Sequence, residues 1–199
     1  MRSLSSLGAG AAKGIATAAL VPALALLTAC ATQTTATLTP SPQAPLCDPA
    51  ASALVLWAPH WRADQKDVAA REDAAAAGLR AFFDRGDCFA RTELRRVAQL
   101  PPAPLPGAGP GAHERVIGVE VRELGPVVRL LASAALVEGG TEAVLRLARY
   151  APATLQEQRG YTVHWRSGGP GTVRGVATLP QDMQAALQAG FWGSGAPKP

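Results

Sequence analysis

The three histidines, His60, His113 and His164, are the side chains of this 199-residue chain best suited to acid–base or metal chemistry. None of them has a second histidine or a cysteine at metal-ligand spacing. The glycine-rich stretches lack the Lys-Ser/Thr of a phosphate-binding loop, and no Gly-x-Ser-x-Gly elbow occurs. The sequence therefore predicts no catalytic residue, no metal site and no cofactor, and it indicates that the chain is not an enzyme.

A cluster of tryptophan and arginine follows the first predicted strand of the folded part. Trp57, Trp61 and Arg62 lie within six residues of one another, shortly before a predicted helix. Binding sites often form where a strand gives way to a helix, and Trp and Arg contribute strongly to interfaces. Trp61 and Arg62 are therefore the candidate partner-binding residues. The alternative is that Trp57 belongs to the core and Trp61 covers the edge of the sheet.

The first 30 residues have the composition of an export signal. Arg2 and Lys13 supply positive charge, and residues 14–27 are uncharged and mostly small or apolar. This run is shorter than the roughly 20 residues that span a bilayer, so it predicts a secretory signal peptide over residues 1–29. The alternatives are an ordinary secreted protein with an incidental Cys30 and a cytosolic chain with an Ala-rich helix.

The four residues that end this segment, Leu27-Thr28-Ala29-Cys30, resemble the lipobox of bacterial lipoproteins. The resemblance implies that residues 1–29 are removed and that Cys30 becomes the acylated first residue, with palmitate among its acyl chains. Two acyl chains already hold a protein firmly in a membrane. Ala31, and not Asp, follows the cysteine, which in such lipoproteins favours the outer membrane. The expected location is therefore the outer membrane, with the protein facing the periplasm.

The two other cysteines, Cys47 and Cys88, form an even pair in a chain that is expected to reach an oxidising compartment. A disulfide between them is predicted. It would close a loop of 41 residues, and the loop-entropy estimate for its stabilisation is about 4 kcal/mol. Two free buried thiols are the alternative.

The charge balance excludes one large class of partners. The formal net charge is +4, and two of the basic residues, Arg2 and Lys13, belong to the leader. Lys and Arg do not cluster in the way a nucleic-acid-binding arm requires, so no nucleic-acid partner is expected. A nearly balanced mature chain also gives no electrostatic steering towards polyanions.

The chain divides by composition into a leader, a linker, one domain and a tail. After the leader, residues 30–46 combine the lipidated cysteine with a Thr/Pro-rich tether. Residues 47–192 are predicted to form a single domain, interrupted by an exposed Pro/Gly loop at residues 100–112. Residues 193–199 are expected to be a disordered tail.

Within the domain, hydrophobic periodicity predicts an α+β fold. Three strands at 115–123, 127–137 and 142–150 are expected to form a meander, because turn residues occupy 124–126 and 138–141. A capping box at 178–181 opens the last helix. Helices are expected on one face of a mostly antiparallel sheet. The remaining predicted elements are strands at 52–59, 89–100, 161–166 and 172–177, a loop at 167–171, and helices at 68–85 and from 179 to about 190.

The segment from Leu54-Val55-Leu56, through the helix that ends at Gly86, to Cys88-Phe89 resembles small periplasmic lipoproteins of the curli-secretion gate and TolB N-terminal kind. The resemblance covers roughly residues 52–150 and carries over no functional residue. We expect a lipid-anchored binding or scaffolding subunit in envelope transport, secretion or assembly. This expectation rests on the lipobox-like segment, the predicted tether and the lack of a catalytic motif in the sequence. An envelope protein is the expected partner, and homo-oligomers are compatible with the sequence. The alternative function is an envelope enzyme, hydrolase-like, whose residues converge from distant parts of the chain.

Overall fold

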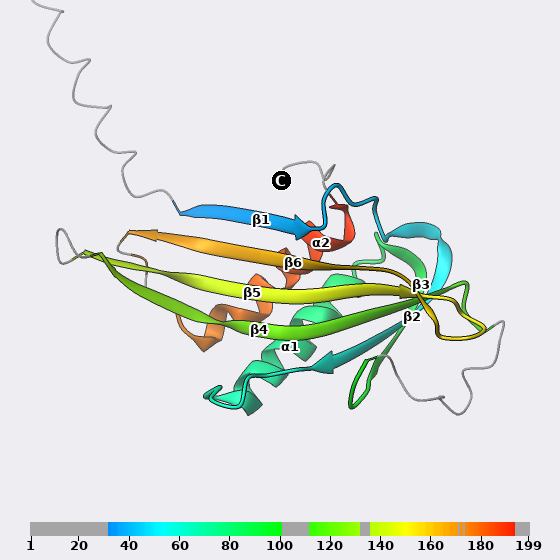
Figure 1. Cartoon of the computed structure of the whole chain (residues 1–199), viewed down its shortest axis with the longest axis horizontal. Coiled ribbons are helices and arrows are strands. Elements are labelled where there is room, and N and C mark those ends of the chain that lie inside the picture. The colour runs from blue at the N-terminus through cyan, green and yellow to red at the C-terminus, as the bar shows by residue number, and fades with distance from the viewer. Residues whose placement is uncertain (1–31, 101–111, 132–135, 171, 173, 194–199) are drawn as a thin grey trace, which may run out of the picture. The chain divides into compact units, whose positions relative to one another are not determined.

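A computed structural model describes residues 32–100, 112–131, 136–170, 172 and 174–193. Six strands form one mixed sheet in the order β1-β6-β5-β4-β2-β3, and two helices accompany it (Figure 1). The predicted α+β class is confirmed. The elements are β1 (Gln33–Thr39), β2 (Asp48–Pro59), α1 (Val68–Phe83), β3 (Phe89–Arg96), β4 (Arg115–Leu131), β5 (Leu136–Tyr150), β6 (Glu157–Pro170), a short 3₁₀ helix (Val176–Thr178) and α2 (Leu179–Phe191).

The sheet is mostly antiparallel, as predicted. β4, β5, β6 and β1 pair antiparallel in turn, whereas β2 runs parallel to both β3 and β4. α1 connects β2 to β3, so these three elements form a strand–helix–strand unit at one edge of the sheet. The disulfide between Cys47 and Cys88 is confirmed, and it joins the residues just before β2 and β3. It therefore ties together the starts of two parallel strands.

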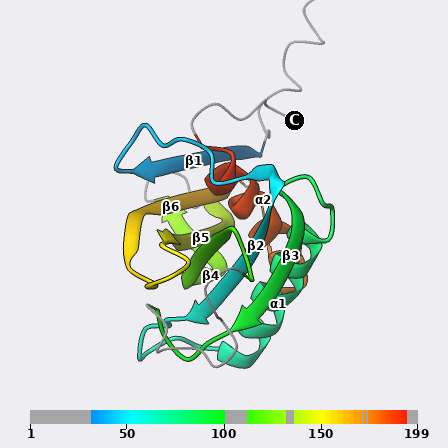
Figure 2. The same ribbon diagram turned by 90° about the vertical axis from the view of Figure 1, so that its right-hand side faces the viewer.

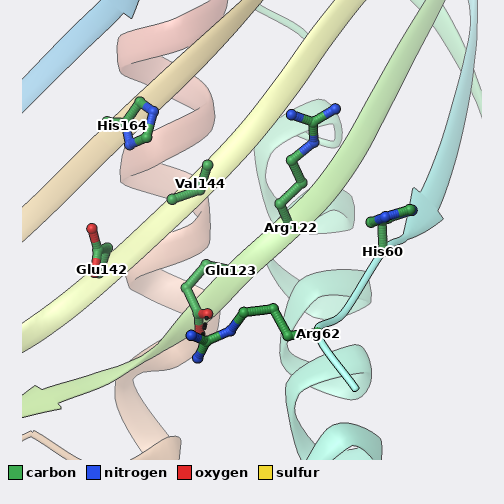
Figure 3. A pocket seen from close by; sticks show the side chains of 7 residues that line it. All are labelled: His60, Arg62, Arg122, Glu123, Glu142, Val144 and His164. Atoms are coloured by element: carbon green, nitrogen blue, oxygen red, sulfur yellow. Dashed lines mark ion pairs between the residues drawn. The ribbon is translucent and has the colours of Figure 1, made fainter. Parts of the chain in front are cut away.

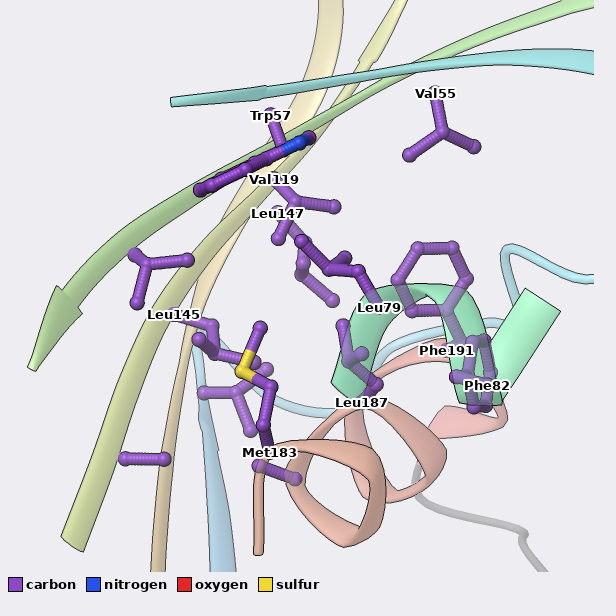
Figure 4. Packing of buried hydrophobic residues seen from close by; sticks show 14 of the residues in the cluster. Val55, Trp57, Leu79, Phe82, Val119, Leu145, Leu147, Met183, Leu187 and Phe191 are labelled. Atoms are coloured by element: carbon purple, nitrogen blue, oxygen red, sulfur yellow. The ribbon is translucent and has the colours of Figure 1, made fainter. Parts of the chain in front are cut away.

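Both helices pack on the same face of the sheet (Figure 2), and the main core lies between them and that face. Side chains alternate along each strand, so every second residue of the central strands enters this core. Figure 4 shows strand residues such as Val119 and Leu145 meeting Leu79 from α1 and Met183 from α2. The helices contribute these buried side chains to the core: Ala75, Leu79, Phe82, Phe83, Met183, Ala186, Leu187 and Phe191.

The predicted three-strand meander is wrong, because two long strands take its place. β4 continues through Gly125 and Pro126, where a turn was expected. The outer edge of β4 has no strand partner beyond Val121, since its pairing with β2 ends there, and an edge is where a strand tolerates proline. β5 likewise runs through Gly139 and Gly140. A Cβ on Gly139 would lie 1.9 Å from the Thr172 carbonyl oxygen, so close backbone approach, and not a turn, accounts for this glycine.

The predicted tether over residues 30–46 is wrong in its middle part. Gln33–Thr39 form β1, which pairs antiparallel with β6 along its whole length. Leu38 of this strand is buried. Threonine favours extended, pleated backbone, so four threonines in seven residues suit an edge strand as well as a linker. The described sheet therefore begins before residue 47, where the domain was expected to start.

Three further local predictions near the C-terminus are wrong. Ser167–Pro170, expected in a loop, belong to β6, and the 3₁₀ helix at Val176–Thr178 occupies part of the expected strand at 172–177. α2 starts at the predicted place, but no capping box forms. The Thr178 hydroxyl donates to Asp182 at 3.0 Å and makes no hydrogen bond to a backbone N–H of the first turn.

Several predictions concern residues outside the described part of the chain. These are the signal peptide, the lipidation of Cys30, most of the Pro/Gly loop at 100–112 and most of the tail at 193–199. They stay predictions. Among the described residues, no helix has the length and apolar character needed to cross a membrane.

Candidate functional site

The face of the sheet opposite the helices is only partly covered. At one end, loop residues Val97, Leu100 and Leu155 pack on a small apolar cluster of the strands. Beyond this cluster lies an open groove of about 570 Å³ (Figure 3). Its position over three strands and the loop after β2 makes it the candidate site. The lining residues are His60, Arg62, Arg122, Glu123, Glu142, Val144 and His164.

Strand register places the groove residues in a row across the sheet. Glu123 of β4 is paired with Val144 of β5, and Val144 with His164 of β6. His60 directly follows β2, and its backbone N–H donates to the Val121 carbonyl of β4 at 2.8 Å. A bulge in β4 falls between Val121 and Glu123. Bulges of this kind redirect side chains, and here the extra residue, Arg122, also lines the groove.

Glu123 is the best-connected side chain of the groove. Its carboxylate accepts hydrogen bonds from Arg71 at 3.0 Å and from Gln65 at 3.1 Å, and it lies 3.4 Å from the Arg62 guanidinium. Arg62 remains exposed, with 67% of its side-chain surface accessible. Gln65 and Arg62 belong to the loop between β2 and α1, so Glu123 holds this loop against β4.

Three other ionisable groups of the groove are available to a ligand. Among the described residues, no partner forms a hydrogen bond or ion pair with the side chain of His60, His164 or Glu142. Arg122 is paired with Glu120, at 2.7 Å. The groove thus presents hydrogen-bond donors and acceptors of both charges around the aliphatic Val144.

A second hollow of about 280 Å³ extends the groove towards the loop after β3. It shares His60 and Arg122 with the first hollow, and it adds Gln99 and Leu100 from that loop. The carboxyl ends of the parallel strands β2 and β3 bring the loop after each strand to this side. The combined surface is therefore built from four strands (β2, β4, β5 and β6) and from the loops that follow β2 and β3.

The structure separates the two predicted partner-binding residues. Arg62 lies in the groove, whereas Trp61 is half-buried against the main core on the helix side. The indole N–H of Trp61 donates to Glu72 of α1 at 3.3 Å. Trp57 is buried and has the Arg96 guanidinium 5.6 Å above its ring. These positions match the alternative in which Trp57 belongs to the core.

His60 and His164 were not singled out as site residues from the sequence. His164 alternates with the buried Val163 and Trp165, and this alternation is the signal that it points away from the core. The alternation does not show which strands lie next to β6, so it could not place His164 beside the other groove residues. The third histidine, His113, lies outside the groove and contacts Glu93 at 3.1 Å.

The pKa shifts found in the described residues concern groups outside the groove. Burial raises the pKa of Tyr161 to about 12 and also raises the pKa of Tyr150. Hydrogen bonding to Arg95 lowers the pKa of Glu93. Among the described residues, no three His, Cys, Asp or Glu side chains are grouped so that they could hold a metal ion. The groove therefore offers charged and hydrogen-bonding groups that can recognise a ligand.

No family profile and no curated protein matches this chain. Several solved structures show a limited likeness. PelC from Paraburkholderia phytofirmans, crystallised as a dodecamer, is 13% identical, with 78% of this chain and 95% of that chain covered and a TM-score of 0.41. A putative neuraminyllactose-binding hemagglutinin homolog from Helicobacter pylori is 11% identical, with 72% and 81% covered and a TM-score of 0.40.

A DUF330 protein from Xanthomonas campestris is similar to the same extent. It is 15% identical, with 79% of this chain and 87% of that chain covered and a TM-score of 0.36. Identities and TM-scores at this level do not transfer a function to this chain. The function must be argued from its own residues.

Proposed function

We propose that this protein is a bacterial lipoprotein, lipidated on Cys30 and held in the outer membrane on the periplasmic side. It binds a protein partner through the groove around Arg62, as a binding or scaffolding auxiliary subunit in envelope transport, secretion or assembly. The lipobox-like Leu27-Thr28-Ala29-Cys30 supports the anchor. The groove on the open face of the sheet supports the binding role.

The observation that carries the binding role is the contrast between the two faces of the sheet. One face is covered by α1 and α2 and forms the core, while the other keeps a groove in which His60, His164 and Glu142 have no side-chain partner within the described part of the chain. A ligand that covers these side chains removes their hydration. It must therefore supply both hydrogen-bond donors and acceptors in place of water. Interleaved positive and negative side chains fit a protein segment of mixed charge better than a polyanion.

The anchor is tested by replacing the acylated residue in the full chain. Cys30→Ala is expected to move the protein from the membrane fraction to the soluble periplasmic fraction. Thr32→Ala, two residues further on, is the matched control and should leave the protein in the membrane fraction. Membrane retention of Cys30→Ala after carbonate extraction would contradict the anchor.

The groove is tested by site-specific photocrosslinking in intact cells. A benzophenone amino acid at His164 is expected to give a discrete adduct with one envelope protein. The control position is Gln181, which is exposed on α2 on the opposite face of the sheet. Glu142→Lys should weaken the adduct from His164, because it reverses a charge in the groove. Equal adducts from His164 and Gln181, or no effect of Glu142→Lys, would count against the groove as the contact surface.

A further inference from the structure

β3 is the last strand in the order of the sheet, so within the described part of the chain it has a strand partner on one side only. The backbone N–H of Val97, just after β3, donates to the Trp57 carbonyl of β2 at 2.9 Å. Backbone groups alternate in direction along a strand, so those of Thr92, Leu94 and Arg96 point away from β2. A row of outward N–H and C=O groups is a template for pairing with another chain.

A hollow of about 310 Å³ lies between this edge strand and α1, and Figure 2 shows α1 beside β3. β3 contributes Leu94 and Arg96 to the hollow, and α1 contributes Asp73, Ala76 and Arg80. The helix residues are three and four positions apart, so they share one face of α1. Leu94 and Ala76 are half-buried against the main core, which makes the middle of the hollow apolar.

Two charged groups of the hollow already have partners in the fold. The Arg96 guanidinium donates to the Glu72 carboxylate and lies 5.6 Å above the Trp57 ring. Glu72 also accepts the indole N–H of Trp61 at 3.3 Å. These contacts hold the end of β3 against α1 and leave Glu72 and Arg96 committed to the protein itself.

Asp73 and Arg80 differ from that pair. Both are exposed, and within the described ranges neither side chain has a hydrogen-bond or ion-pair partner. Seven residues separate them, which is about 10 Å along the helix at about 1.5 Å per residue. The helix wall of the hollow therefore offers a free acid at one end and a free base at the other, with Ala76 between them.

This wall defines the side chains that an added strand would need. Alternate residues of a strand point to the same face, so positions i, i+2 and i+4 would all face the hollow. They span about 13 Å, and the lengths of the Asp73 and Arg80 side chains cover the difference. A basic residue, an apolar residue and an acidic residue in this order, or in the reverse order, match Asp73, the apolar middle and Arg80.

The two edges of the described sheet do not supply this pattern. β1, at the other edge, has the uncharged sequence Gln-Thr-Thr-Ala-Thr-Leu-Thr. On the helix side β3 presents Thr92, Leu94 and Arg96, which include no acidic group for Arg80. The charges therefore fit a segment of a different protein better than a second copy of this chain.

We propose that β3 and α1 bind an extended segment of another protein, which adds a strand to the sheet alongside β3. The segment carries a basic, an apolar and an acidic side chain at alternate positions. Main-chain hydrogen bonds to β3 provide the affinity, and the alternate side chains provide the specificity. This site lies on the helix side of the sheet and is separate from the groove around Arg62.

The test uses the full-length protein in dodecyl maltoside micelles and the fluorescein-labelled peptide Thr-Lys-Thr-Val-Thr-Glu-Thr, followed by fluorescence polarisation. Comparison peptides carry lysine at both charged positions or glutamate at both. The parent protein should bind the mixed peptide about fivefold more tightly than either comparison peptide. Asp73→Lys should instead prefer the glutamate peptide, and Arg80→Glu the lysine peptide. Loss of folding cannot produce such an exchange of preference.

Asp84→Lys is the matched control, because Asp84 is exposed and lies just past α1 outside the hollow. It should keep the preference of the parent protein. Strand pairing is tested with N-methyl groups either on Lys, Val and Glu of the mixed peptide or on its threonines. Only one of these sets of N–H groups can face β3, so one methylated peptide should lose binding and the other should keep it.

Lack of saturable binding by the mixed peptide, or unchanged preferences in both charge-reversal variants, would overturn the proposal. An equal effect of the two methylation patterns would also overturn it, because it would exclude pairing along β3. Thr92→Pro removes an outward N–H at a place where a strand tolerates proline. A dimer of the parent protein in light scattering that Thr92→Pro abolishes would assign the edge to a second copy and overturn the partner segment.

Discussion

Arg71 of α1 and Glu123 of β4 form a largely buried ion pair at 3.0 Å, with 10% and 19% of their side-chain surfaces accessible. Arg71 also donates to the Leu124 carbonyl at 2.6 Å. The pair lies just beyond the end of β2, so an arginine side chain occupies the place where β4 lacks a strand partner. A Cβ on Gly125 would lie 1.7 Å from the Arg71 guanidinium, which explains the glycine in this strand.

Arg71→Met is expected to lower the free energy of unfolding by about 3 kcal/mol, because it leaves the Glu123 carboxylate partly buried without its main partner. Urea unfolding followed by circular dichroism measures the change. Arg80→Met is the control, since Arg80 lies on the same helix but is exposed. That variant should stay within about 0.5 kcal/mol of the parent protein. Similar losses in the two variants would refute a special role of the pair.

Removal of the disulfide should cost about 4 kcal/mol in the free energy of unfolding, on the loop-entropy estimate for a 41-residue loop. The Cys47→Ala/Cys88→Ala double variant tests this directly by urea unfolding. Dithiothreitol should lower the unfolding midpoint of the parent protein and leave that of the double variant unchanged. An equal effect of dithiothreitol on both proteins would show that the loss has another cause.

The elements predicted best from the sequence are the two helices, because their hydrophobic periodicity and their end signals are local. The helix at 68–85 and the last helix have an apolar stripe with clear ends, and α1 and α2 lie where expected. The error at β4 has a physical origin. Leu124-Gly125-Pro126 has turn composition, yet proline and glycine also suit an unpaired strand edge against which an arginine lies. A turn and an unpaired strand edge differ here only in tertiary structure: the pairing of β2 with β4 ends at Val121, which leaves the following residues of β4 at an edge.

The candidate site was predictable only in part, for a related reason. Arg62 was identified because it follows the first predicted strand. His60 is its near neighbour in sequence, but Glu142 and His164 join it through strand pairing between segments that are 80 and 102 residues away, and local patterns carry no such pairing. Trp61 was expected beside Arg62, but the chain turns between β2 and α1 so that the indole faces Glu72 on the helix side.

The packing of the two helices against each other depends on Gly78. A Cβ at this position would lie 2.6 Å from the Met183 Cβ and 2.7 Å from the Pro180 carbonyl oxygen. Gly78→Ala gains about 1 kcal/mol in helix propensity. The overpacking costs about 1–3 kcal/mol. A net loss is therefore expected in thermal or urea unfolding.

The matched control for Gly78→Ala is Gly175→Ala, since a Cβ at Gly175 meets nothing within 4 Å. That variant should unfold within about 0.5 kcal/mol of the parent protein. A Gly78→Ala protein that is more stable than the parent would show that the helices separate at no cost.

The two tyrosines of the chain should ionise late in the folded protein, because burial raises the pKa of each. Absorbance at 295 nm measures tyrosinate. Its rise should lie above pH 10 in the native protein and near pH 10 in urea, the ordinary value for tyrosine. A native titration that coincides with the one in urea would contradict the buried positions.

The same shift predicts a loss of stability at high pH. The folded-state pKa of Tyr161 is about 12, and the unfolded value is about 10, so the unfolded state loses its proton first. The contribution is complete below about pH 10 and falls by about 2 kcal/mol as the pH rises to 12. Tyr161→Phe removes this dependence and the hydrogen bond to the Gly190 carbonyl. The alkaline loss of stability should therefore be smaller in Tyr161→Phe, and an unchanged loss would assign it to other groups.

The pairing of β1 with β6 has a consequence for the order in which the protein folds. The hydroxyls of Thr34 and Ser167 are hydrogen-bonded at 3.1 Å across a sequence separation of 133 residues. The first strand to leave the ribosome must therefore wait for nearly the whole chain before it finds its neighbour, and contacts of such separation form slowly. Until then the residues of β1 have no partner in the sheet. The edge of the sheet that β1 provides is therefore completed late in folding.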